Sequence, residues 1–267
     1  MSGYAAVFRV RFIYALQYRA AALAGLATQF AWGFMEILAY AAFYRANPAA
    51  FPMTFSQTVS YVWIQQAFLA LFMVWFWDND IASSIENGFI AYDLVRPIDL
   101  YGRWFSQITA NRIASASLRC MPVLIVAFII PEPYRMTLPP DISQFALFLL
   151  SAALTLAVVA VFSMLIYISL FYMLSSTGIR YVLSALADFL AGSIVPLPFF
   201  PQPVRSIVEL LPFAAMQNMP LRIYSGNIAG FDALKGIALQ VFWFAALLLT
   251  GRFAMGRALK RVIVQGG

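Results

Sequence analysis

Six apolar runs, separated by short polar segments, are the feature that most constrains how this chain can fold. They cover residues 20–44, 57–77, 106–130, 142–174, 181–196 and 234–255. About 20 apolar residues in helical conformation cross the hydrocarbon core of a bilayer, where a helix satisfies its own backbone hydrogen bonds. The sequence therefore predicts an all-α, polytopic membrane protein with six transmembrane helices, forming a single transmembrane domain over residues 1–267.

Composition supports this class and restricts the partners. Hydrophobic residues make up 63% of the chain and charged residues 10%, whereas soluble proteins average roughly 45–50% and about 25%. The net charge is +6, but the basic residues flank the apolar runs and form no stripe. Membrane lipids with anionic headgroups are therefore the expected partners, and nucleic acid is not.

The distribution of lysine and arginine predicts the orientation. Of the 17 basic residues, twelve fall in the N-terminal segment, the first and second inner loops with the start of the third span, and the C-terminal tail. The predicted outer segments hold the other five, namely Arg45, Arg135, Arg205, Arg222 and Lys235. Because basic loops stay on the cytoplasmic side, both termini are expected in the cytoplasm.

The loop over residues 78–103 is the longest polar interruption in the first half of the chain, and it holds five of the 11 acidic residues. Asp78 or Asp80 can cap the N-terminus of a short helix, and Gly88 suits a left-handed stop at its C-terminus. A short helix is therefore expected over residues 80–87.

Two further patterns in this loop refine the expectation. Ser83 and Glu86 have the spacing of a capping box, in which a hydroxyl and a carboxylate bond each other's backbone N–H groups. Arg96 precedes Pro97, and a residue before proline is pushed toward an extended conformation. A second helix is therefore not expected to run through this point.

The run from Ile85 to Ile90 (IENGFI), followed by Leu94 to Pro97 (LVRP), resembles the loop between the second and third spans of permease subunits of bacterial type-2 ABC exporters. Tyr18 to Ala20, with Gly25, and Gln265 to Gly267 fit the same family. The order of the apolar runs is similar along nearly the whole chain.

This resemblance implies a function and its partners. The chain would be the membrane-spanning half of an exporter in a bacterial inner membrane. It would pair with a second permease, either itself or a sister chain, and with separate ABC ATPase subunits that hold ATP and Mg²⁺. The loop 78–103 would contain a coupling helix that docks on the ATPase, with the contact carried by Ile85, Glu86, Gly88, Arg96 and Pro97. Glu86 as a plain helix cap and Arg96 as a phospholipid contact are the alternatives.

Two other segments have predicted shapes. Residues 4–19 are apolar and aromatic with interspersed arginines, which predicts an N-terminal interfacial helix. A cytosolic extension of the first span fits this segment equally well. Four prolines in residues 196–203 cannot continue a helix. A re-entrant outer helix pair is therefore expected over residues 197–221, before the last span.

Among the charged residues that lie within the apolar runs, four are candidate site residues: Glu36, Arg112, Arg119 and Asp188. Ionisable side chains in a membrane are costly, so each is a candidate for the transport pathway. Glu36 is near the outer end of its run and could simply reach water. Arg112 and Arg119 share a helical face, which either extends into the cytosol, the interpretation we favour, or lines a cavity. Asp188 is predicted to pair with one of these arginines.

The sequence offers no catalytic or metal site. It contains no histidine, one cysteine (Cys120), and two lysines that do not follow glycine, so imidazole chemistry, multi-cysteine metal sites and the phosphate-binding loop of ATPases are excluded. The chain is predicted to be no enzyme and to hold no cofactor. An ion-coupled secondary transporter and a non-transporting membrane scaffold are the alternative functions. A secondary transporter usually has ionisable residues at the bilayer midplane and an inverted repeat, and neither is clear here.

Overall fold

The computed structural model describes residues 3–17, 19–47, 49, 51–173 and 177–261, with only the backbone described at 19–23, and every regular element in these ranges is a helix. The predicted all-α class is therefore confirmed. The motif residues Tyr18 and Gln265 to Gly267 lie outside the described ranges.

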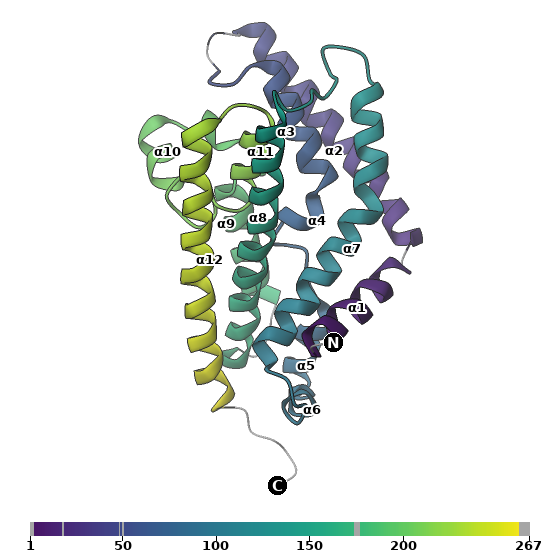
Figure 1. The fold of residues 1–267 in the computed structure, drawn as a ribbon, viewed down its shortest axis with the longest axis vertical. Coiled ribbons are helices and arrows are strands. Elements are labelled where there is room, and N and C mark those ends of the chain that lie inside the picture. Colours follow the sequence, from purple (N-terminus) through teal and green to yellow (C-terminus); the bar gives the residue numbers. More distant parts are fainter. Residues whose placement is uncertain (1–2, 18, 48, 50, 174–176, 262–267) are drawn as a thin grey trace.

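Three helices of the described part are long and apolar enough to cross a membrane: α7 (Leu100–Ile129), α8 (Ile142–Ser169) continued by the 3₁₀ turn η2 (Leu170–Tyr172), and α12 (Gly230–Leu259). Helix α12 packs along α8, while α2 (Arg19–Ala46) lies beside α7 (Figure 1). The helices α7 and α12 are each longer than the runs 106–130 and 234–255. The arrangement of six spans stays a prediction.

The N-terminal segment forms a helix of its own. Helix α1 (Gly3–Leu16) packs on the first turns of α7 (Figure 1). Gly102 makes this contact possible, because a Cβ at Gly102 would lie 2.7 Å from Cε1 of Tyr4. A separate helix, as opposed to an extension of α2, is confirmed. Its position at the membrane surface stays a prediction.

The second span is wrong as a single helix over 57–77. Helix α3 (Phe55–Ala67) ends at Phe68, α4 (Leu69–Phe72) adds one turn, and no helix follows until α5. The helix does not resume after Phe72 because a buried arginine from α7, described below, bonds carbonyl oxygens of Ala70, Met73 and Phe76 and so replaces helical N–H donors.

The loop 78–103 folds into two short helices at one end of the bundle (Figure 1). Helix α5 (Asn79–Glu86) confirms the predicted short helix within one residue at each end. Gly88, with φ of 74°, separates it from α6 (Ile90–Leu94), which ends before Arg96. The capping box is wrong, because the Ser83 hydroxyl lies inside α5 and donates to backbone carbonyls one turn earlier.

The fifth span, predicted over 181–196, is wrong at both ends. Helix α9 spans Thr177–Leu190 and stops well before the prolines. Gly192, with φ of 83°, closes it: the N–H of Ser193 donates to the carbonyl of Asp188 at 3.0 Å. This is the Schellman pattern, in which a left-handed glycine ends the helix.

Short helices fill the region that follows. They are the 3₁₀ turn η3 (Leu197–Phe199), α10 (Gln202–Val208) and α11 (Asn218–Tyr224). Their placement agrees with the predicted pair of short helices over 197–221, and the re-entrant position in a membrane stays a prediction.

Candidate functional site

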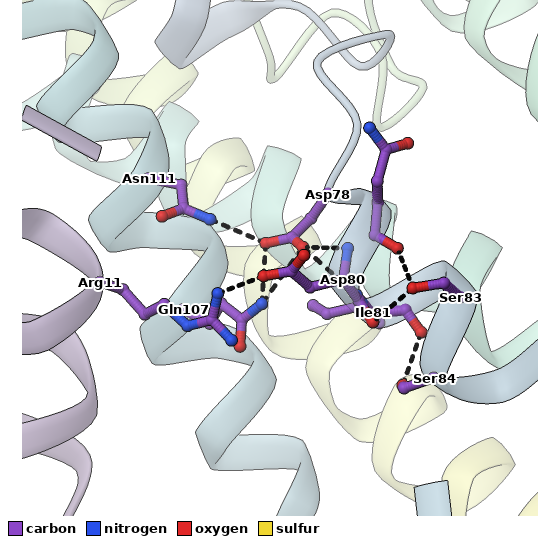
Figure 2. A network of polar contacts seen from close by, with 9 residues as sticks. Arg11, Asp78, Asp80, Ile81, Ser83, Ser84, Gln107 and Asn111 are labelled. Atoms are coloured by element: carbon purple, nitrogen blue, oxygen red, sulfur yellow. Dashed lines mark hydrogen bonds and ion pairs between the residues drawn. The ribbon is translucent and has the colours of Figure 1, made fainter. Parts of the chain in front are cut away.

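The carboxylate of Asp78 fastens the short helix α5 to the long helix α7 (Figure 2). It accepts hydrogen bonds from the backbone N–H groups of Asp80 (3.1 Å) and Ile81 (3.3 Å), which caps α5. The same two oxygens accept from Nε2 of Gln107 (3.1 and 3.0 Å) and Nδ2 of Asn111 (2.8 Å). Gln107 and Asn111 are one helical turn apart on α7 and so share a face.

The backbone of Asp78 and the side chain of Trp77 both contact α8. The N–H of Asp78 donates to the hydroxyl of Tyr167 at 2.6 Å. The rings of Trp77 and Tyr167 pack with centroids 4.2 Å apart, and the Arg180 guanidinium of α9 lies 4.9 Å from the Trp77 ring. The start of α5 is thereby attached to three longer helices.

Arg112 holds the irregular segment that precedes α5. Its Nη1 donates to the carbonyls of Ala70 (3.0 Å) and Met73 (2.8 Å), and its Nη2 donates to the carbonyl of Phe76 (3.1 Å) and the hydroxyl of Ser163 (3.3 Å). Arg112 is 1% exposed. These acceptors are what a buried guanidinium requires, so Arg112 is satisfied inside the protein. That this part of α7 lies in the cytosol stays a prediction.

The predicted ion pair between Asp188 and Arg112 or Arg119 is wrong. Asp188 accepts from the backbone N–H of Val74 at 3.3 Å, and no ion pair of the described residues joins it to Arg112 or Arg119. Arg119 lies against α2, where a Cβ on Gly25 would come within 2.9 Å of its Cζ. Arg112 and Asp188 thus hold the same irregular segment, and Arg119 lies apart from them.

Ion pairs tie α1 and α7 to the same loop. Arg11 of α1 pairs with Asp80 of α5. Arg103 of α7 pairs with Asp93 of α6 at 2.5 Å, and Arg96 approaches Asp93 at 3.7 Å. Together with the Asp78 hydrogen bonds, these ion pairs attach α5 to α1 and α7, and α6 to α7.

The residues predicted to carry coupling all lie at this end of the molecule. Ile85 is partly buried and packs into the core beneath α5. Glu86, Gly88, Arg96 and Pro97 are exposed. The half-buried Glu36, in α2, belongs to a different region. Gln107 and Asn111 were not predicted as partners of Asp78, although their four-residue spacing on one face of a predicted helix indicates that they could bind a common partner.

Apolar side chains project from α6 and its flanks. Tyr92 is 70% exposed and Val95 82% exposed, with Phe89 and Leu94 also exposed. Exposed apolar groups gathered at the tip of a charged loop are typical of a protein contact surface. We call these four residues the loop tip.

Comparison with known proteins assigns the family. The model of the ABC-2 family transporter protein matches residues 30–266. The comparison with curated proteins yields no match. The matched range includes the loop tip, the Asp78 contacts and the helices α7, α8 and α12. This chain therefore belongs to the ABC-2 transporter family, as a multi-pass membrane permease component.

Proposed function

We propose that this permease forms half of the translocation pathway of an ATP-driven exporter and is driven by a separate ATPase subunit that docks on the loop tip. The observation that carries the proposal is the attachment of α5 through Asp78. One carboxylate caps the short helix and accepts hydrogen bonds from two side chains of α7.

This attachment suits the transmission of a mechanical displacement. Moving α5 relative to the bundle requires breaking charge-assisted hydrogen bonds to α7 and the bond from Asp78 to Tyr167 of α8. Moving α5 together with α7 and α8 leaves those contacts intact. A push on the loop tip would therefore rotate the long helices as a rigid body, one of the common routes to alternating access.

The ATPase supplies what this chain lacks. Permeases of this family are in general non-catalytic, so ATP and Mg²⁺ would bind in the partner, and a second permease would complete the pathway. The start of α1 and the end of α12 lie toward the same end of the bundle as α5 and α6 (Figure 1). This common end would face the cytoplasm of a bacterial cell, in agreement with the charge distribution.

The test is a gentle affinity purification of the tagged chain from its native membrane, followed by mass spectrometry. We expect a soluble ATPase at about one copy per permease. Val95→Asp should abolish its recovery, because a carboxylate would replace an apolar contact at the loop tip. Leu138→Asp is the matched control, since Leu138 is a similarly exposed apolar residue (74%) in a loop at the other end of α7. A permease recovered without any ATPase, or equal recovery from both variants, would contradict the proposal.

A further inference from the structure

A cavity of about 450 Å³ lies between α1 and the segment that joins α6 to α7. This volume falls within the range of small-molecule binding sites, roughly 300–1,000 Å³. It is separate from the loop tip and from the Asp78 carboxylate. Its lining combines an apolar stretch of α1 with three arginines: Val7, Val10, Tyr14, Arg11, Arg96 and Arg103.

The three arginines come from three different segments and leave an excess of positive charge. Asp80 pairs with Arg11, and Asp93 serves both Arg103 and Arg96. Three guanidinium groups thus face two carboxylates. Arg96 has the weakest hold on its partner, because its Nε lies 3.7 Å from Asp93 Oδ1, beyond hydrogen-bond distance, and its side chain is 57% exposed.

The apolar side of the cavity continues onto the surface of α1. Val10 is 66% exposed and Tyr14 is 49% exposed, and both line the cavity. Their neighbour Ile13 is 48% exposed. An interfacial helix turns such a face toward the acyl chains of the membrane. A ligand that enters along this face would therefore bring an apolar tail, and it would meet the arginines at its charged end.

We infer that this cavity binds an anionic phospholipid, with the phosphate at the arginines and the adjacent acyl carbons against Val7, Val10 and Tyr14. Guanidinium groups are suited to phosphate because their planar fork of N–H donors matches its oxygens. The continuity with the exposed face of α1 favours a membrane lipid over a free phosphate ion. Bound there, the lipid would bridge α1 and the loop between α6 and α7.

Binding can be measured by native mass spectrometry of the delipidated permease, titrated separately with phosphatidylglycerol and phosphatidylcholine. We expect preferential binding of phosphatidylglycerol. Arg96→Gln should weaken it about fivefold, the effect of one basic residue near an anionic lipid. Arg135→Gln is the matched control, because Arg135 also pairs with a carboxylate three residues earlier and is 48% exposed. It should leave the binding unchanged.

A second variant tests the cavity itself. Val7→Trp fills the space and should weaken phosphatidylglycerol binding while all the arginines stay in place. Equal binding of the two lipids, equal effects of Arg96→Gln and Arg135→Gln, or unchanged binding in Val7→Trp would each overturn the inference. Displacement of the lipid by millimolar inorganic phosphate alone would overturn the membrane as the source of the ligand.

Discussion

The two ends of the bundle solve the same physical problem with different chemistry. Each packs non-helical backbone among apolar helices, where unpaired carbonyl and N–H groups are costly. At the α5 end the partners are charged, namely Arg112 and Asp78. At the other end neutral amides bond the backbone: Gln240 Nε2 donates to the carbonyl of Ala215 at 2.9 Å, and Gln144 Nε2 donates to that of Ile228 at 2.6 Å. The charged Arg222 of α11 also lies there, but it donates to the side chains of Glu209 and Asn227 and to no backbone carbonyl among the described contacts.

The difference indicates what each end does. The neutral amides at the α10–α11 end come from α8 and α12 and hold buried loops in place; both Gln144 and Gln240 are almost fully buried. The charged contacts at the α5 end connect a projecting element to the long helices. Ionised groups form stronger and more directional hydrogen bonds than neutral ones. Under the proposed function, the charged contacts at the α5 end would transmit a displacement, whereas the neutral amides at the α10–α11 end would maintain a shape.

Arg112→Met should have the largest effect on stability. Methionine fills much of the volume but leaves the carbonyls of Ala70, Met73 and Phe76 without their donor. A buried carbonyl left without a donor costs about 1–3 kcal/mol, so three of them should together cost at least about 3 kcal/mol. Thermal unfolding in detergent measures the loss. Arg119→Met is the control, because Arg119 is less buried, and similar unfolding temperatures for the two variants would contradict the role given to Arg112.

Asp78→Asn should have the next largest effect. It should lower the free energy of unfolding by about 1.5–3 kcal/mol, the range for a hydrogen bond to a charged group. The amide would direct N–H donors toward those of Gln107 and Asn111. We expect the ATPase still to bind, because the loop tip is unchanged, but ATP hydrolysis by the reconstituted complex should lose its dependence on the permease. Hydrolysis identical to that of the wild-type complex would break the distinction between the two ends.

Gln240→Leu should cost about 1–3 kcal/mol, because the carbonyl of Ala215 and the hydroxyls of Ser151 and Thr155 lose a buried partner. The folded fraction should hydrolyse ATP in complex at the wild-type rate, since this end only maintains a shape. A variant that folds well but whose complex hydrolyses ATP without dependence on the permease would show that the α10–α11 end takes part in transmission.

The smallest effect concerns pH. Asp141 caps α8, and the hydrogen bonds from the Ser143 hydroxyl and then the Gln144 N–H lower the pKa of its carboxyl below the ordinary value. A lowered folded-state pKa stabilises the protein above the unfolded value of about 3.9. The stabilisation is lost as the pH falls through the folded-state pKa. The unfolding temperatures of wild type and Asp141→Ala should therefore differ at pH 7 and converge at strongly acid pH, whereas a constant difference would contradict this.

Local signals account for what could be predicted from the sequence. Apolar runs located the long helices, and Asp78 with Gly88 delimited α5, because caps act within one turn. Long-range partners account for what could not. The end of the helix after Phe72 depends on Arg112, about 40 positions later, and no local pattern indicates it. Gly192 was a local signal for the end of α9. The prolines, which also end helices, led to the prediction that the fifth span continues to residue 196.

The same contrast applies to the candidate site. Glu86, Arg96 and Pro97 were predicted from the motif of the loop 78–103, and they lie at the end of the bundle that contains α5 and α6. The Asp78 contacts depend on how α7 and α8 pack, which the sequence does not specify. Charge alone led to the wrong partner for Asp188, because this carboxylate accepts a hydrogen bond from the backbone N–H of Val74, a donor that no sequence pattern indicates.

The most direct test of the central claim is the distance between spin labels on α5 and α7, measured by pulsed electron resonance with and without ATP. Ser83 and Ser117 are exposed positions on these helices, and Cys120 would be replaced by serine. In the permease–ATPase complex, we expect the same mean distance in both states, because α5 would move together with α7. We also expect a broadened distribution in Asp78→Asn. A wild-type distance that shifts by several ångströms when ATP binds would contradict the claim that α5 and α7 move as one body.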